Sequence, residues 1–261
     1  MLVCYWLLTV QIVVESFPIS SSTHVKLLEL FLISLQYPIE SWCSNELLNH
    51  LAHGPTILIL ALFFYPRWSF LLYNIRRCWR LIIKLCMRVA VADLITCGFY
   101  IGIKQCVVPP STIGVGMVVT AVALASLHWC PTKNAHAPWN WPRVLLLGCA
   151  QGVALLPGIS RLALTFVTAR WMGISPRKSF EISFLIQWPL IAAAFVHAVG
   201  TLYLHDALGQ FLHTDILLIM LVSTIIAWYA LRITNYCAMT GRLWWFAWYM
   251  TVPFTAWLFI R

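Results

Sequence analysis

Two short stretches of the chain place proline, serine and ionisable residues inside otherwise apolar sequence. The first contains Gln11, Glu15, Pro18, Ser20, Ser21 and His24. Gln11 and Glu15 are four residues apart, so they share one face of a helix. A carboxylate inside an apolar span is energetically costly, which makes Glu15 a functional candidate. We predict that Ser21 is a nucleophile and that His24 accepts its proton, whereas Ser22 and Thr23 are expected only to cap a helix.

The second stretch contains Gln151, Pro157, Gly158, Ser160, Arg161 and Thr165. No acidic residue lies within ten positions of Arg161 on either side, and an unpaired guanidinium in an apolar span needs an anionic partner. That partner is either a distant acid, such as Glu15 or Glu181, or a bound phosphate. A fork of donors beside the free amides of a helix that begins after Pro157-Gly158 favours the phosphate.

The two stretches together contain the side chains needed for phosphoryl transfer on a lipid pyrophosphate. Arg161 would hold the pyrophosphate, and Ser21 would attack the terminal phosphorus or position a water that does so. Glu15 would orient His24 or bind a divalent cation (Mg²⁺, Ca²⁺ or Mn²⁺) that bridges the phosphates. We expect Gln11, Ser20, Gly158, Ser160 and Thr165 to contact the substrate.

The composition of the chain indicates the elements that must position these residues. Apolar residues make up 61% of the sequence and charged residues 10%, whereas an average soluble protein has about 25% charged residues. This excludes a soluble domain and predicts an all-α polytopic protein whose partner is the lipid bilayer. The formal net charge of +9 does not indicate nucleic-acid binding, because the basic residues are dispersed between apolar spans.

Six apolar runs have the length of about 20 residues that a transmembrane helix needs. They are Gly54–Tyr73, Leu81–Ile103, Ser111–Cys130, Ile182–Leu204, Asp215–Ile233 and Leu243–Ile260. Two further apolar regions, Met1–Pro38 and Val144–Gly173, are interrupted by the two polar stretches, through which a regular helix cannot continue. Irregular backbone at membrane depth requires protein or water around it. We therefore predict two re-entrant helical hairpins in addition to six transmembrane helices.

The basic residues predict the orientation of this layout. Apart from Arg161, every Lys and Arg except Lys26, Lys104 and Arg261 falls on one side, which is the cytoplasmic side by the positive-inside rule. Both termini are then outside, and the hairpins enter from opposite faces. Such an arrangement is typical of an inverted repeat. We predict one integral membrane domain, with residues 1–130 as the first repeat, including the hairpin 1–38, and residues 131–261 as the second, including the hairpin 144–178.

The two stretches resemble the motifs of the bacterial undecaprenyl-diphosphatase family, also called the bacitracin-resistance family. A third similar segment contains Glu181, Ser183, Phe184, Leu185 and Pro189. The resemblance implies hydrolysis of undecaprenyl pyrophosphate to undecaprenyl phosphate at the outer face of a bacterial inner membrane, which recycles the carrier lipid for cell-wall synthesis. It also implies divalent-cation dependence, an acid–base or metal role for Glu15, a nucleophilic role for Ser21 and phosphate binding by Arg161.

The chain departs from this family pattern at three places. Leu162-Ala163 stands where the family usually has Ser-Gly, Gln11 stands at a position that is often acidic, and Thr23 stands where glycine is common. The first departure removes a hydroxyl and a flexible glycine beside the phosphate, and the second removes one potential metal ligand.

Two other functions fit part of the pattern. The type 2 phosphatidic acid phosphatases also use a Ser-Arg pair, but they need a histidine and then an aspartate soon afterwards, and the next histidine here is His197. A transporter or flippase for a phosphorylated lipid could use the same broken helices without hydrolysis, although it would not need Glu15, Ser21 and His24. Homodimer formation is left open. The remaining histidines, including His53, are assigned no role.

Overall fold

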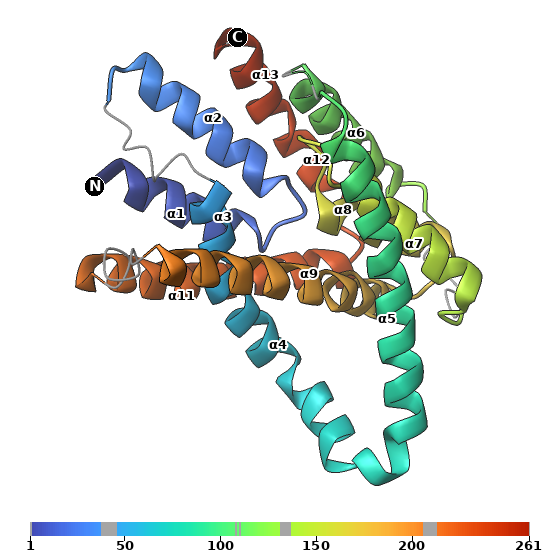
Figure 1. Cartoon of the computed structure of the whole chain (residues 1–261). Helices are drawn as coiled ribbons and strands as arrows, with labels where there is room; N and C mark the ends of the chain where they lie inside the picture. Colours follow the sequence, from blue (N-terminus) through green and yellow to red (C-terminus); the bar gives the residue numbers. More distant parts are fainter. Residues whose placement is uncertain are drawn as a thin grey trace.

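The computed structural model describes residues 2–37, 46–107, 109, 111–130, 137–205 and 213–260, and all regular structure in these ranges is α-helical (Figure 1). The first half contains α1 (Leu2–Val14), α2 (Ser21–Ser34), α3 (Glu46–Leu51), α4 (His53–Tyr73), α5 (Ile75–Lys104) and α6 (Thr112–Ser126). The second half contains α7 (Trp141–Val153), α8 (Arg161–Trp171), α9 (Pro176–Leu204), α11 (Thr214–Met239), α12 (Trp245–Tyr249) and α13 (Thr251–Ile260). The predicted all-α class is confirmed for the described residues.

Within the described ranges, three helical segments are long and apolar enough to cross a membrane. They are Leu47–Tyr73, Pro176–Leu204 and Thr214–Met239. The run Leu243–Ile260, predicted as one helix, is divided into α12 and α13. Pro253 explains the division, because it lacks an amide hydrogen and its ring clashes with the carbonyl of Tyr249, four residues earlier. The predicted number of six full transmembrane helices is therefore not confirmed.

Both polar stretches interrupt helices where the sequence predicts. The first break lies between α1 and α2, and the second lies between α7 and α8 (Figure 1). Backbone groups at such breaks need partners, because lipid offers none. Thr234 of α11 donates a hydrogen bond to the carbonyl oxygen of Ser16 at 2.8 Å. Thr120 of α6 donates to the carbonyl oxygen of Gly158 at 3.1 Å and accepts from the amide of Ser160 at 3.0 Å.

The second break packs backbone against backbone on α6. Gly158 has a φ of +91°, which favours glycine, and a Cβ atom there would lie 2.2 Å from the carbonyl oxygen of Ile113. A Cβ atom on Gly116 would lie 2.2 Å from the carbonyl oxygen of Pro157. These contacts fix the loop that leads into Arg161.

Each hairpin packs on helices of the opposite half of the chain. Helix α1 contacts α11 and α2 contacts α13, whereas α7 contacts α5 and α8 contacts α6. Gly148 and Gly152 allow the close approach of α7 to α5, because a Cβ atom on Gly152 would lie 2.5 Å from the ring of Phe99. This exchange brings the two breaks together in the interior.

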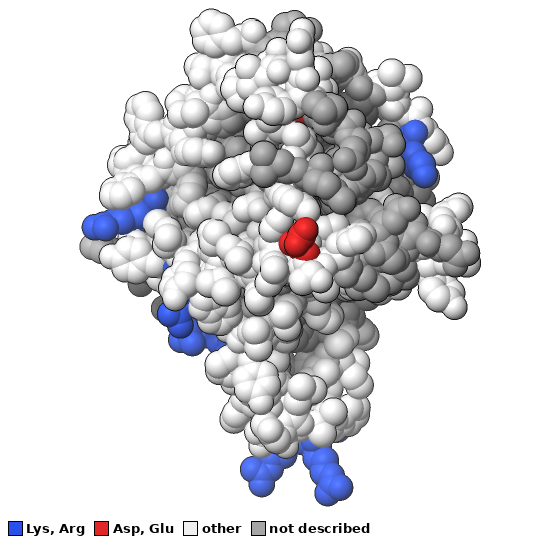
Figure 2. All heavy atoms as spheres, turned by 90° about the vertical axis from the view of Figure 1, so that its left-hand side faces the viewer, with Lys and Arg blue, Asp and Glu red and all other residues white. Residues whose placement is uncertain are grey.

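Helices α4 and α5 diverge from a common turn to form a tip that projects from the rest of the molecule (Figure 1). Lys and Arg side chains gather at this tip (Figure 2). The first half of α5 supplies Arg76, Arg77, Arg80 and Lys84 next to this turn, and these side chains are exposed. The opposite ends of α4 and α5 reach the two breaks, so the polar site and the basic tip lie at different ends of these helices.

Candidate active site

A cavity of about 520 Å³ lies between the two hairpin breaks. Gln11, Glu15, Ser20 and Ser21 line it from the first hairpin, and Ser160 and Arg161 line it from the second. Helix α4 adds His53, and α9 adds Gln187. Side chains separated by about 140 positions in the sequence therefore face one partly open cavity.

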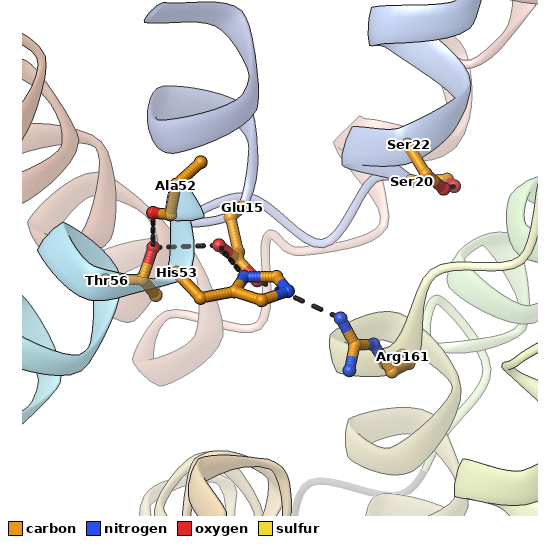
Figure 3. A network of polar contacts seen from close by, with 7 residues as sticks. All are labelled: Glu15, Ser20, Ser22, Ala52, His53, Thr56 and Arg161. Carbon is orange, nitrogen blue, oxygen red and sulfur yellow. Dashed lines mark hydrogen bonds and ion pairs between the residues drawn. The ribbon is translucent and has the colours of Figure 1, made fainter. Parts of the chain in front are cut away.

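Glu15 is the centre of a buried polar network (Figure 3). Glu15 is the first residue after α1, at the first break, and only 6% of the residue is exposed. Thr56 donates its hydroxyl hydrogen to Glu15 Oε2 at 2.8 Å. His53 Nδ1 lies 3.0 Å from Glu15 Oε2 and 2.9 Å from Oε1. The carboxylate is therefore held by donors from α4, as a buried charge requires.

His53 and Glu15 form a carboxylate–imidazole pair. When Nδ1 carries the hydrogen that faces Glu15, the other ring nitrogen, Nε2, is free to accept a proton. A carboxylate on the far side of the ring stabilises the imidazolium that results. His53 is 5% exposed, so its ring is fixed by packing, and it lines the cavity. In this pair the Glu15 carboxylate orients the His53 imidazole.

Arg161 approaches this pair from the second hairpin (Figure 3). Its Nη2 atom lies 3.9 Å from Glu15 Oε1, which is too long for a hydrogen bond. The guanidinium makes no hydrogen bond to any residue that the structure describes, and a quarter of the side chain is exposed. Glu15 therefore attracts Arg161 electrostatically but accepts no hydrogen bond from it. The guanidinium donors are available to an anion in the cavity.

The serines of the first hairpin have different surroundings. Ser20 precedes α2, is buried, and its Oγ accepts a hydrogen bond from Thr23 at 2.9 Å. Ser21 is the first residue of α2 and lines the cavity. Ser22 lines it as well, with its Oγ 3.4 Å from that of Ser20. Of the three hydroxyl groups, that of Ser20 is engaged in holding the start of α2, whereas Ser21 and Ser22 both line the cavity. The nucleophilic role of Ser21 stays a prediction.

His24 lies apart from the Glu15 network. Its Nδ1 atom is 2.6 Å from the carbonyl oxygen of Ser20, and its ring stacks on Tyr249 with centroids 5.7 Å apart. It is not among the residues that line the cavity. The structure therefore places His24 where it fixes the backbone that precedes Ser21, and it brings a different histidine, His53, to Glu15.

The substrate-binding residues expected in the second hairpin are mostly structural in their contacts. The Ser160 hydroxyl accepts a hydrogen bond from the amide of Ala163 at 3.3 Å, so it caps α8. The Thr165 hydroxyl donates to the carbonyl oxygen of Arg161 at 2.7 Å, within the same helix. Gly158 shapes the turn against α6. Of these three residues, Ser160 alone lines the cavity.

Sequence reasoning missed His53 and Gln187, because their neighbours in the cavity come from distant segments. His53 is 38 residues from Glu15, and no motif spacing joins them. Glu181, which was considered for the site, pairs instead with Arg67 and lines a separate cavity of about 400 Å³. Glu181, near the start of α9, thus forms an ion pair with the part of α4 that lies away from the candidate site.

The residues present can be compared with the needs of a divalent cation. The described residues contain no group of three or more His, Cys, Asp or Glu side chains placed to bind a metal. The cavity does offer the Glu15 carboxylate, and the side-chain oxygens of Gln11 and Gln187 are buried without a hydrogen-bond partner among the described residues. Magnesium usually binds through one or two carboxylates together with substrate phosphates, and these oxygen ligands fit that mode.

The chain is similar to known proteins over most of its length. The family model described as Bacitracin resistance protein BacA matches residues 6–253, which include both hairpin motifs. The chain is 29% identical over 200 residues to the undecaprenyl-diphosphatase of Elusimicrobium minutum, which covers 72% of this chain and 71% of the relative. The undecaprenyl-diphosphatase of Korarchaeum cryptofilum is 26% identical over 260 residues and covers 93% and 92%. The chain belongs to the bacitracin resistance protein BacA family.

Proposed function

We propose that this protein hydrolyses undecaprenyl pyrophosphate to undecaprenyl phosphate and inorganic phosphate. The observation that carries the proposal is the meeting of Arg161 with the Glu15–His53 pair in one cavity, 3.9 Å apart and without a hydrogen bond between them. Relatives that match this chain are named undecaprenyl-diphosphatase. In a bacterial inner membrane, the reaction returns the carrier lipid to cell-wall synthesis.

Arg161 binds the terminal phosphate of the substrate. Its planar guanidinium can donate two parallel hydrogen bonds to phosphate oxygens. Because the cavity lies among buried apolar residues, the interaction is stronger than it would be in water. The negative charge that develops on the phosphate during the reaction is stabilised by the same group, without any rearrangement of the site.

The reaction begins with attack on the terminal phosphorus. The Oγ atom of Ser21, or a water that it positions, forms the new bond to phosphorus as His53 Nε2 takes the proton. The bond between the phosphorus and the bridging oxygen breaks, and undecaprenyl phosphate leaves with that oxygen. In the serine route, a water then cleaves the phosphoserine and releases inorganic phosphate. His24 holds the carbonyl of Ser20 and thereby positions Ser21.

The scheme includes a divalent cation as a proposed partner of the substrate phosphates. Glu15, with the side-chain oxygens of Gln11 and Gln187, would hold it against the phosphates, where it would neutralise charge on the substrate and leaving group. Gln11 supplies a neutral ligand where a second carboxylate would bind the ion more strongly. We therefore expect weak binding of Mg²⁺, Ca²⁺ or Mn²⁺ in the absence of substrate.

The proposal includes six membrane-crossing segments, two re-entrant hairpins and an inverted repeat of residues 1–130 and 131–261. The exchange of contacts between halves supports it, because each break is held by a threonine of the opposite half. The basic tip between α4 and α5 lies at the other end of these helices from the cavity, which supports a cavity that opens to the outer face. Both termini would then lie outside.

A detergent assay distinguishes hydrolysis from transport of a phosphorylated lipid. Purified protein in detergent micelles has no second compartment, so transport cannot occur. We expect release of one inorganic phosphate per undecaprenyl pyrophosphate, with undecaprenyl phosphate as the lipid product. A Glu15→Gln variant serves as the negative control. Binding of the substrate without phosphate release by the unmodified protein would favour the transporter.

A further inference from the structure

An apolar groove of about 570 Å³ runs along one face of α5. Its lining residues on α5 recur every three or four positions, as one helical face requires. They are Ile95, Gly98, Phe99, Gly102 and Ile103, and Cys106, two residues after the end of α5, continues the lining. Leu156, from the break between α7 and α8, closes one side. Because an α-helix rises about 1.5 Å per residue, the lining from Ile95 to Ile103 extends roughly 12 Å along α5.

The groove is continuous with the candidate active site. Ile103 and Leu156 line both the groove and the polar cavity that contains Arg161. They form a common rim, with ionisable groups on one side and only apolar side chains, glycines and Cys106 on the other. A ligand with a charged head and a hydrocarbon chain would match the two compartments across this rim.

Two glycines keep the groove open. A Cβ atom added to Gly98 or Gly102 would have no atom of the described residues within 4 Å, so neither glycine is required for packing in the described part of the chain. Gly148 and Gly152 of α7 are different, because added Cβ atoms there would meet Ala92 and Phe99 of α5. Phe99 therefore packs on α7 and forms one fixed side of the groove. Gly98 and Gly102, which have no side chains, leave the space of the groove next to it.

We propose that this groove binds the isoprene units of the substrate next to the pyrophosphate, and that Gly98 and Gly102 set the room available to them. The inference rests on the proposed pyrophosphatase function and names the part of the protein that recognises the lipid chain. When Arg161 holds the pyrophosphate, the apolar isoprenoid chain attached to it has no favourable contacts inside the polar cavity. The chain therefore passes out of the cavity between Ile103 and Leu156, where the groove begins.

The test fills the groove without disturbing the fold. Gly98→Leu and Gly102→Leu place a side chain into the open space. Gly200→Leu on α9 is the matched control, because its Cβ atom would also meet nothing within 4 Å and it lies outside the groove. All three changes raise helix propensity, so insertion and stability should be retained. Phosphate release is measured with undecaprenyl pyrophosphate and with dimethylallyl pyrophosphate, which has a single isoprene unit.

We expect kcat/KM for undecaprenyl pyrophosphate to fall about tenfold or more in the two groove variants, because chain contacts with apolar surface are lost. The value for dimethylallyl pyrophosphate should change less than about twofold, and Gly200→Leu should match the unmodified protein. A photoreactive group in the first isoprene units should label the segment 95–106 in the unmodified protein and not in the groove variants. This labelling does not require turnover.

Three results would overturn the inference while leaving hydrolysis intact. The first is an unchanged kcat/KM for undecaprenyl pyrophosphate in both groove variants. The second is an equal loss for both substrates, which would place the effect in the polar cavity. The third is a change from dimer to monomer with unchanged chain-length dependence, which would make Gly98 and Gly102 a contact between two copies. Labelling of α5 without any phosphate release would instead refute the proposed function and retain the lipid groove.

Discussion

His53 provides the sharpest test of how the site works. The side chain donates to the buried carboxylate of Glu15 and presents its other ring nitrogen to the cavity. Replacing His53 with glutamine separates these two roles. The glutamine amide can still donate a hydrogen bond to Glu15, but it cannot accept a proton at neutral pH. If His53 is the general base, His53→Gln should be inactive even though the carboxylate keeps a donor.

The expected magnitude follows from the two roles. Loss of a general base lowers kcat by about 10²–10⁴-fold. Loss of a hydrogen bond to a charged group costs about 1.5–3 kcal/mol, and this second effect should appear only in His53→Ala. We therefore expect His53→Gln to lower kcat strongly with an unchanged thermal midpoint, and His53→Ala to lower both.

The assay is release of inorganic phosphate from undecaprenyl pyrophosphate in detergent, with kcat and KM determined separately. His24→Gln is the matched comparison, because His24 is the histidine that the sequence predicts for the site and it contacts the Ser20 carbonyl instead of Glu15. The reasoning fails if His53→Gln retains kcat within about threefold of the unmodified protein while His24→Gln loses it by about 10²-fold or more. That outcome would return the proton-accepting role to His24.

Three further changes test the surroundings of the site. Thr120→Val removes the donor to the carbonyl of the second break and leaves it buried, which should cost about 1–3 kcal/mol and lower the thermal midpoint measured by scanning fluorimetry. Gly116→Ala places a Cβ atom 2.2 Å from a backbone oxygen of the same break, so α6 must move, and we expect lower activity as well as lower stability. Chelation of divalent cations should lower kcat, with recovery on addition of Mg²⁺; unchanged turnover in chelator would remove the cation from the scheme.

The sequence predicted the positions of the two hairpin breaks more accurately than the residues at which the other helices begin and end. Proline, glycine and serine in the two motifs locate both breaks, because these residues interrupt helices by their own geometry. Helix α5 begins six residues before the predicted run at Leu81, because Arg and Lys form helices well although they are not apolar. Pro253 could have indicated the division between α12 and α13. The prediction of one helix over Leu243–Ile260 relied on the apolar composition of that run instead.

The candidate site was predictable only as far as local motifs extend. Glu15, Ser21 and Arg161 line one cavity because each belongs to a hairpin break, and the breaks meet in the interior. His53 could not be identified in this way. It begins α4, and its contact with Glu15 depends on how α4 packs against α1. Local spacing specifies which residues share a helix face, whereas pairing between distant helices is decided by packing.

The most direct test of the central claim is the rate of phosphate release by purified Arg161→Ala protein that inserts and folds normally. Arg161 joins the two hairpins at one cavity, and its donors are unoccupied by any described residue. We predict that release of inorganic phosphate from undecaprenyl pyrophosphate falls by about 10³-fold or more, since the main stabiliser of phosphate charge is lost. Turnover equal to that of the unmodified protein would contradict the assignment of this cavity as the site of hydrolysis.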